Sequence, residues 1–216
     1  MTIDAILFDL DGTLADTAPE LAAALNAVRR AEGLPSLSYE AIRPVVSHGA
    51  RALIHLGFPD SEGEDFQRLR QRLLDHYQAH LGENTRLFPG MNELLSELEG
   101  RGLPWGVVTN KPGWLTEPLM AAMGLERRAA VIVSGDTCPH AKPHPAPLHH
   151  ACHQAGMENR HCLYLGDAPR DIQAARAAGM PAAVALWGYL AEDDRPQDWG
   201  AHHLLHHPLE LLELLP

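Results

Sequence analysis

Six short apolar segments recur along the chain, and most are separated by stretches with the periodicity of amphipathic helices. Alternation of this kind predicts βα units around a parallel sheet, because parallel strands need long crossover connections that are usually helical. The segments are rich in Val, Ile, Leu and Ala, as expected for strands buried on both faces. They cover residues 5–9, 105–109, 130–134, 162–166, 182–186 and 202–205. We therefore predict an α/β fold with a doubly wound, Rossmann-like parallel sheet.

The alternation is interrupted between the first two segments. Residues 16–87 contain no comparable strand candidate, and Leu69, Leu73 and Tyr77 fall near helical spacing. A chain of 216 residues is long enough for one ordinary domain with a smaller insertion. We predict an all-helical insertion over residues 16–87, with residues 1–15 and 88–216 forming the α/β core.

Composition excludes several classes of function. Acidic residues outnumber basic ones by 28 to 17, and the formal net charge of −11 is opposite to that of a nucleic-acid binder. The N-terminus lacks the basic region of a secretory signal, and the most apolar later stretch, residues 181–191, is shorter than a bilayer span. The three cysteines form no Cys-x-x-Cys motif and cannot all pair internally. We expect a cytoplasmic protein with free thiols and neither a nucleic-acid nor a membrane partner.

Two carboxylates follow the first apolar segment, in Asp9-Leu10-Asp11-Gly12-Thr13. Open α/β folds place their ligands at the carboxyl ends of the strands, where this motif falls. Like charges about 4 Å apart repel by roughly 4 kcal/mol at an effective dielectric constant of 20, so the pair needs a cation, a proton or an outward turn. The alternative interpretation is a strand end followed by a common Asp-Gly turn.

Three further strand ends or nearby loops carry polar residues that could join the same centre. Thr109 and Asn110 offer a hydroxyl and an amide that can donate hydrogen bonds to a phosphate oxygen, or they simply cap the strand. Lys142-Pro143 suits the opening of a helix that would hold the lysine near the sheet edge. Asp167 and Asp171 follow another apolar segment, and either could instead be a helix N-cap.

Taken together, Asp9 to Thr13, Thr109-Asn110, Lys142-Pro143 and Gly166-Asp167 with Asp171 resemble the four signature motifs of the haloacid dehalogenase superfamily, in its phosphoglycolate phosphatase-like branch. The helical insertion resembles the small cap domain of that branch. Residues 105–112, 117–120, 199–201 and 207–211 are also similar to segments of the bacterial N-acetylmuramic acid 6-phosphate phosphatases.

The resemblance implies a role for each acidic residue of the first and last motifs. Asp9 would be the nucleophile that forms an aspartyl-phosphate. Asp11 would protonate the leaving alkoxide and then accept a proton from the hydrolytic water. One Mg²⁺ would be held by the Asp9 carboxylate, the Asp11 backbone carbonyl and Asp167, in keeping with the preference of this ion for oxygen ligands.

The other motifs would bind the transferring phosphoryl group. Thr109, Asn110 and Lys142 would hold its oxygens, with Lys142 counted among the catalytic residues because electrostatic positioning supplies most of the catalysis in phosphoryl transfer. Asp171 would orient Lys142 or a metal-bound water. Two departures from the common pattern, His144 and Ala168, remove none of these roles.

Substrate choice is expected from the cap, because the core contacts only phosphate and metal. Arg51, and less favourably Arg43, could pair with a substrate carboxylate, although most arginines are simply exposed. Arg170 is expected to face outward. The paired histidines, at positions 149–150, 202–203 and 206–207, lack the spacing of a structural zinc site and are expected at the surface.

The sequence as a whole predicts a Mg²⁺-dependent phosphatase that hydrolyses a small phosphate monoester through an aspartyl-phosphate. The expected substrate is that of an N-acetylmuramic acid 6-phosphate phosphatase or a phosphoglycolate phosphatase. A 2-haloacid dehalogenase is disfavoured, because it needs neither a metal nor an acid at position 11. The alternatives left open are a phosphosugar mutase of the same superfamily and a non-catalytic phosphate-binding regulator. Protein partners and oligomeric state are not predicted.

Overall fold

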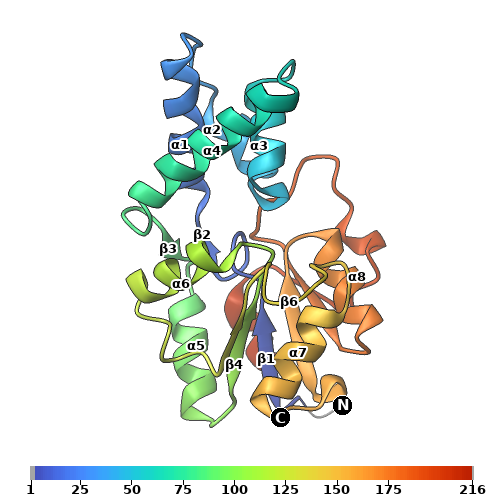
Figure 1. The fold of residues 1–216 in the computed structure, drawn as a ribbon. Coiled ribbons are helices and arrows are strands. Elements are labelled where there is room, and N and C mark those ends of the chain that lie inside the picture. Colours follow the sequence, from blue (N-terminus) through green and yellow to red (C-terminus); the bar gives the residue numbers. More distant parts are fainter. Residues whose placement is uncertain (1–2, 216) are drawn as a thin grey trace.

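The computed structural model describes residues 3–215 and contains a six-stranded parallel sheet at its centre (Figure 1). The strand order is β5-β4-β1-β6-β7-β8, so β1 lies in the middle and its end is flanked by the ends of β4 and β6. All six predicted strands are present, most of them one residue shorter at an end than predicted. Their bounds are β1 Ala5–Phe8, β4 Trp105–Val108, β5 Val131–Val133, β6 Cys162–Gly166, β7 Ala182–Ala185 and β8 His203–Leu205.

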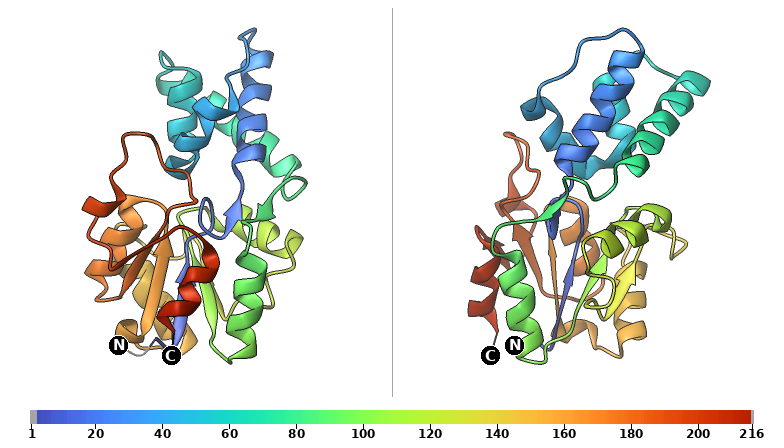
Figure 2. Two further views of the ribbon diagram at one scale, coloured as in Figure 1. Left: turned by 180° about the vertical axis from the view of Figure 1, so that it is seen from behind. Right: turned by 90° about the vertical axis from the view of Figure 1, so that its left-hand side faces the viewer.

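Helices cover both faces of the sheet, which confirms the doubly wound fold. Alternation along β1 divides its side chains: Ile6 and Phe8 face one hydrophobic cluster, and Ala5 and Leu7 face the other. The first cluster is covered by α5 (Met91–Gly100), α6 (Gly113–Ala122) and the 3₁₀ helix η4 (Pro208–Leu214), and the second by α7 (Ala146–Ala155) and α8 (Pro169–Ala177). Two further 3₁₀ turns are η2 (Asn159–His161) and η3 (Pro196–Asp198). Helices α5 and η4 lie side by side (Figure 2).

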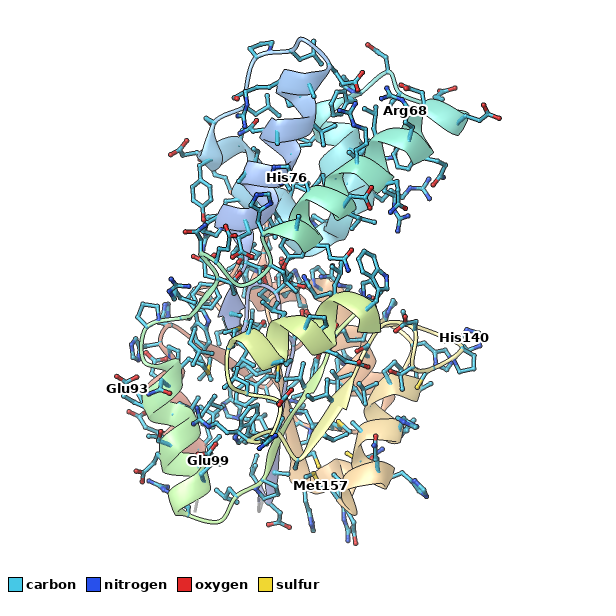
Figure 3. The ribbon with its side chains drawn as sticks, turned by 60° about the vertical axis from the view of Figure 1, so that its left-hand side comes forward. Arg68, His76, Glu93, Glu99, His140 and Met157 are labelled. Atoms are coloured by element: carbon cyan, nitrogen blue, oxygen red, sulfur yellow. The ribbon has the colours of Figure 1, made fainter. Side chains whose placement is uncertain are left out.

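A second group of helices lies beyond the carboxyl edge of the sheet (Figures 1 and 2). We call residues 18–79 the helical unit. Its elements are α1 (Ala18–Ala31), α2 (Tyr39–Ile42), the 3₁₀ helix η1 (Arg43–His48), α3 (Gly49–Gly57) and α4 (Gly63–Ala79). The periodic Leu69, Leu73 and Tyr77 are buried on α4, where they hold this helix in the unit. Figure 3 shows Arg68 on the side of α4 remote from the sheet, where it pairs with Glu32.

Two connections join the helical unit to the sheet, and they pair as a short antiparallel ribbon that the sequence did not predict. Its strands are β2 (Ala15–Asp16) and β3 (Arg86–Leu87). The buried carboxylate of Glu20, on α1, accepts hydrogen bonds from three backbone N–H groups and one hydroxyl of the returning connection, those of Gly82, Asn84 and Thr85. The outgoing and returning segments are thereby tied together next to the sheet edge.

The surface carries the paired histidines. All six of these side chains are exposed, as the sequence predicts. His140, on the loop before α7, also lies at the outer surface (Figure 3). Within the described chain, every helix is too short or too polar to span a bilayer.

Candidate active site

The loop after β1 reaches the loop after β6 at the carboxyl edge of the sheet. The backbone N–H of Asp9 donates to the carbonyl oxygen of Leu165 at 2.8 Å. The chain then turns at Gly12, whose φ of +88° is a left-handed conformation that favours glycine. A Cβ atom at position 12 would lie 2.2 Å from Oδ2 of Asp167. Glycine at this position therefore allows the two loops to approach closely.

Three buried carboxylates and one ammonium meet at this point. One oxygen from each of Asp9, Asp167 and Asp171 lies within 4.8 Å of the other two. The Nζ atom of Lys142 is 2.9 Å from Oδ1 of Asp9 and 2.7 Å from Oδ1 of Asp171. Carboxylates this close repel one another in the low dielectric of the interior, and the buried ammonium offsets part of that repulsion. The Asp171 carboxylate in turn fixes the position of Lys142.

The hydrogen bonds of Lys142 leave Asp9 with free bonding capacity. The Nζ atom of Lys142 donates to the carbonyl oxygen of Val108 at 2.9 Å and to the hydroxyl of Tyr164 at 2.7 Å. It also forms the ion pair with Asp171. An ammonium has three N–H donors, so with two of them on Val108 and Tyr164 only one remains for Asp171 and Asp9 together. Among the described residues, Oδ1 of Asp9 is one of the few buried side-chain oxygens that accept no directed hydrogen bond. Its lone pairs are available to a reacting group or a cation.

The position of Lys142 corrects one prediction. Lys142-Pro143 does not open a helix, because α7 begins at Ala146, four residues later, with Pro147 in its first turn. The lysine is held instead by the side chain of Asn110, which accepts from the Lys142 backbone N–H at 3.0 Å and donates to its carbonyl oxygen at 2.9 Å. This amide ties the loop before α7 to the end of β4.

Asp167 lies between the sheet and the helical unit. Its Oδ2 accepts hydrogen bonds from the hydroxyl of Ser47, on η1, at 2.7 Å and from the backbone N–H of Tyr189 at 2.9 Å. Burial, and then the charges of Asp9 and Asp171, raise the pKa of Asp167 to about 7. The raised pKa of Asp167 reflects an excess of negative charge among these carboxylates when no cation is bound.

These residues fit a magnesium ion. Mg²⁺ prefers hard oxygen ligands and is usually bound through one or two carboxylates together with substrate phosphate. Asp9 has an unbonded buried oxygen, and Asp167 has a pKa that a neighbouring cation would lower. No other group of three or more His, Cys, Asp or Glu residues within residues 3–215 has this spacing. The carboxylate of Asp11 is not part of the group.

Asp11 points away from the other carboxylates. It accepts a hydrogen bond from the hydroxyl of Thr17 at 2.6 Å and pairs with Nζ of Lys111 at 2.9 Å. Lys111 is buried and lies 4.5 Å from the ring centre of Tyr77. Burial acts against the charge, but Asp11 and Tyr77 outweigh it and raise the pKa of Lys111. The two aspartates of the first motif thus have separate surroundings, as different chemical roles require.

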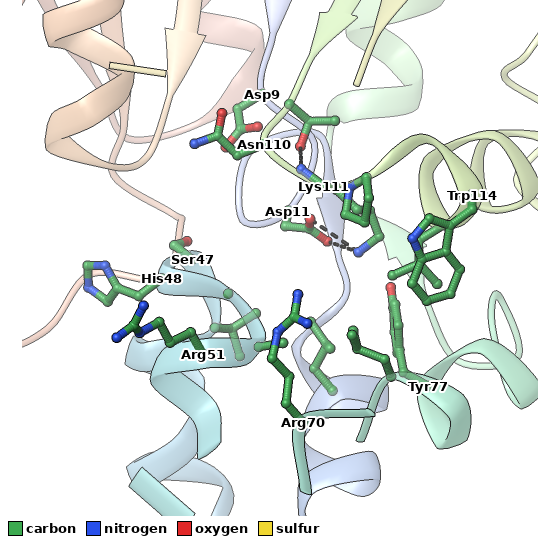
Figure 4. A pocket seen from close by; sticks show the side chains of 18 of the residues that line it. Asp9, Asp11, Ser47, His48, Arg51, Arg70, Tyr77, Asn110, Lys111 and Trp114 are labelled. Atoms are coloured by element: carbon green, nitrogen blue, oxygen red, sulfur yellow. Dashed lines mark hydrogen bonds and ion pairs between the residues drawn. The ribbon is translucent and has the colours of Figure 1, made fainter. Parts of the chain in front are cut away.

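The side chains of Asp9 and Asp11 line a cavity of about 530 Å³ between the sheet edge and the helical unit (Figure 4). Five residues predicted for the site lie on its wall: Asp9, Asp11, Arg51, Thr109 and Asn110. Lys142 and Asp167, also predicted, do not line the cavity but are buried beside Asp9. The structure therefore brings segments from four distant parts of the chain to one place.

Several cavity residues were not predicted: Ser47, Arg70, Tyr77, Lys111 and Trp114. Arg70 and Tyr77 lie on one face of α4, because they are seven residues apart. The feature of the sequence that could have indicated Arg70 is its polar side chain on an otherwise apolar helix face. Lys111 follows directly on the Thr109-Asn110 motif and could have been inferred from that neighbourhood. Ser47 and Trp114 carried no signal, because only the tertiary arrangement places them at the cavity.

Two expectations for arginine residues were wrong. Arg170 does not face outward: it lines the cavity and donates a hydrogen bond to the carbonyl oxygen of Ser47. Arg43 does not line the cavity and therefore is not placed to pair with a substrate. Its guanidinium donates to the carbonyl oxygen of Trp187 at 3.0 Å and lies over the ring of Tyr189. Both arginines join the helical unit to the sheet, a role that depends on the packing of the two parts.

The sequence is similar to a known protein family and to named bacterial enzymes. The sequence model of the family described as haloacid dehalogenase-like hydrolase matches residues 6–185. The chain is 44% identical over 209 residues to the phosphoglycolate phosphatase of Xanthomonas campestris pv. campestris strain 8004, covering 97% of this chain and 95% of the relative. It is 43% identical over 216 residues to the N-acetylmuramic acid 6-phosphate phosphatase of Pseudomonas aeruginosa, covering 100% and 96%.

The fold also matches solved structures. A crystal structure of a predicted phosphoglycolate phosphatase from Haemophilus somnus 129pt superposes with a TM-score of 0.89. The two sequences are 26% identical, and the match covers 99% of this chain and 98% of the other. The likeness includes the helical unit as well as the sheet, because nearly the whole of each chain is covered.

Proposed function

Since this chain belongs to the haloacid dehalogenase-like hydrolases and is a phosphoric monoester hydrolase, we propose that it hydrolyses a small phosphate monoester through an aspartyl-phosphate on Asp9, with Mg²⁺ as cofactor. The observation that carries this proposal is the buried Asp9 oxygen without a directed hydrogen bond, at the sheet end of the cavity and beside Lys142. A carboxylate so placed is free to attack.

In the first step, an oxygen of Asp9 forms a bond to phosphorus while the bond from phosphorus to the ester oxygen breaks. The leaving alkoxide takes a proton from Asp11, which is left as a carboxylate. Thr17 and Lys111 stabilise that carboxylate through the contacts seen here. In the second step, Asp11 takes a proton from water, whose oxygen attacks phosphorus and releases Asp9 and inorganic phosphate.

Other residues would hold the phosphoryl group and the cofactor. Thr109 offers its hydroxyl to the phosphoryl oxygens. Since the Asn110 side chain is bonded to the Lys142 backbone, we propose that Asn110 contributes its backbone N–H instead. Asp9, the Asp11 carbonyl and Asp167 would hold Mg²⁺. When bound, this ion supplies positive charge that offsets the charge of the carboxylates and of the transferring phosphoryl group.

We further propose that residues 16–87 act as a cap over a core of residues 1–15 and 88–216. Ser47 and Arg170 place the helical unit against the carboxylates, where it would exclude bulk water during the reaction. The proposed setting is the cytoplasm, where the three free cysteines would stay reduced. The proposed substrate is one of the two named for the relatives, phosphoglycolate or N-acetylmuramic acid 6-phosphate.

The test is phosphate release from p-nitrophenyl phosphate, with and without Mg²⁺, by the intact chain and by Asp9→Asn. We expect Mg²⁺-dependent release that this variant loses while its thermal unfolding stays cooperative. Asp60→Asn, which alters an exposed carboxylate in the turn between α3 and α4, is the matched control and should retain full activity. Undiminished activity of Asp9→Asn would remove the nucleophile. Conversion of a sugar phosphate to its isomer without phosphate release would indicate a mutase.

A further inference from the structure

The cavity is larger than a phosphoryl group and a two-carbon acid require. Its volume of about 530 Å³ lies within the range of about 300–1,000 Å³ that is typical of pockets for sizeable organic ligands. Asp9, Thr109 and Asn110 stand at the end formed by the sheet. The remaining wall comes mainly from η1, α3 and α4 and from the start of α6, so most of the space is available to the part of the substrate that does not react.

That remaining wall is positively charged. Arg51 and Arg70 both line the cavity, and within residues 3–215 neither forms an ion pair or a hydrogen bond to a carboxylate. Unpaired arginines on a cavity wall are unusual in a chain with a formal charge of −11, and the planar guanidinium matches a carboxylate bidentately. The wall therefore favours a second anion on the substrate, away from the phosphate.

Arg70 is better placed than Arg51 to bind it. The guanidinium of Arg70 points into the cavity toward the region of Asp11 and Lys111, whereas that of Arg51 lies beside His48 (Figure 4). Arg51 is exposed, rests over the ring of Phe66 at 5.9 Å and also borders a second, more open hollow. Arg70 is half-buried, so its contact with an anion would be less weakened by water.

Two aromatic side chains form the adjoining wall. Trp114, the second residue of α6, is 41% exposed although it is a large apolar side chain, and it stands at the cavity rim directly after the Thr109–Pro112 segment. Tyr77 is 1% exposed, and among the described residues its buried hydroxyl has no hydrogen-bond partner. Its ring lies against the charged Lys111 and closes this side of the cavity.

We propose that this cavity selects a phosphomonoester with a sugar-sized body and a separate carboxylate, with Arg70 binding the carboxylate and Trp114 packing against the face of the sugar ring. The inference rests on the proposed phosphatase function and specifies its substrate. Of the two substrates named for the relatives, N-acetylmuramic acid 6-phosphate has both features, whereas phosphoglycolate has the carboxylate but no ring.

The experiment compares kcat/KM for substrates that differ in one feature at a time. N-acetylmuramic acid 6-phosphate has ring and carboxylate, N-acetylglucosamine 6-phosphate has the ring alone, and phosphoglycolate has the carboxylate alone. The intact chain should prefer the first. Arg70→Gln should lower kcat/KM for it by about tenfold to hundredfold, the value of a lost charged hydrogen bond, and leave N-acetylglucosamine 6-phosphate unchanged.

Matched variants separate specificity from folding. Arg72→Gln, on the same helix but paired with Glu32 outside the cavity, should leave all three substrates unchanged. Trp114→Ala should lower kcat/KM for both sugar phosphates and spare phosphoglycolate, and Trp114→Phe should restore most of the loss. Effects on KM larger than those on kcat would show that these residues bind the substrate rather than support the reacting groups.

The outcomes distinguish this inference from the function on which it rests. If no phosphate is released from any substrate with Mg²⁺, the phosphatase proposal fails. If phosphate is released but phosphoglycolate is preferred, or if Arg70→Gln lowers all three activities equally, the substrate inference is overturned while the phosphatase proposal stands.

Discussion

At the residue scale, the site depends on how one ammonium is shared among three carboxylates. Lys142 donates hydrogen bonds to Val108 and Tyr164, so Asp9 and Asp171 share its remaining N–H group, and Asp167 forms no ion pair among the described residues. The interior therefore contains more negative than positive charge at this point. Burial and the neighbouring charges of Asp9 and Asp171 accordingly raise the pKa of Asp167 to about 7.

This raised pKa predicts how stability depends on pH. In the metal-free protein, Asp167 keeps its proton up to about 7, whereas in the unfolded chain it loses the proton near the ordinary value of 3.8. Between pH 3.8 and about 7, the folded state therefore binds more protons than the unfolded chain. As pH rises through this range, the contribution of Asp167 to the free energy of unfolding declines. Because Mg²⁺ requires the ionised form, it should raise Tm more at about pH 8 than at about pH 5.5.

Thermal unfolding in EDTA and in Mg²⁺ across this pH range is the measurement. Asp167→Asn serves as the control, since it has no proton to lose and should make the effect of Mg²⁺ on Tm small and nearly independent of pH. A Mg²⁺ effect of equal size at both pH values in the unaltered chain would contradict the assignment of Asp167 to the cation.

The sequence predicted the carboxylates at the sheet edge better than it predicted their surroundings. Asp9, Asp11 and Asp167 could be selected because each lies just after a recognisable strand. Lys111 and Arg70 could not be selected in the same way, because a lysine or arginine on a loop or helix is usually an exposed surface charge. Their positions on the cavity wall follow from the packing of α4 and α6 against the sheet edge. The local signals, a polar residue in an apolar helix face and a place beside the Thr109-Asn110 motif, do not show that packing.

At the element scale, the loop after β1 determines whether the carboxylates can meet. Its turn at Gly12 has a left-handed φ, and a side chain there would overlap Asp167. Gly33, at the end of α1, also has a left-handed φ of +76°, but a Cβ atom there would have no neighbour within 4 Å. A substitution at either glycine would meet the same left-handed backbone, but only one at Gly12 would also meet a steric contact.

We expect Gly12→Ala to abolish phosphate release and the stabilisation by Mg²⁺, because Asp167 must move. Gly33→Ala should cost only about 1–2 kcal/mol of unfolding free energy, the strain of a left-handed alanine, and leave activity intact. Phosphate release and urea unfolding of both variants test this. Equal loss of activity in the two would mean that backbone strain, rather than contact with Asp167, is responsible.

Periodicity explains which elements were predictable. The six core strands are short apolar runs bounded by turns, and all of them were found. The ribbon of β2 and β3 was not predicted, because each of its strands has only two residues, too few to show a periodic pattern of apolar residues. Lys142-Pro143 was assigned to a helix start because proline suits that position, yet Pro147 occupies the first turn of α7 and Asn110 holds Lys142 in the preceding loop.

At the scale of the whole molecule, the residues proposed for catalysis and those proposed for selectivity lie in different parts of the chain. The sheet edge supplies Asp9, Thr109 and the buried carboxylates, whereas the helical unit supplies Arg70, Tyr77 and Ser47. Among the contacts that join the parts, the one from Ser47 to Asp167 connects the helical unit directly to the proposed cation site. This division allows the substrate to change through α3 and α4 while the reacting groups stay fixed.

The central claim is that Asp9 accepts the phosphoryl group. It is tested most directly by acid-quenching the Asp11→Asn variant during turnover of p-nitrophenyl phosphate. The p-nitrophenolate leaves without the proton that Asp11 would give, and the variant lacks the proposed base for hydrolysis. Borohydride then reduces an aspartyl-phosphate to homoserine, which peptide mass spectrometry locates. We predict homoserine at position 9 and at no other aspartate. Homoserine at position 167 or 171, or its absence from position 9 while the variant still releases phosphate, would contradict the claim.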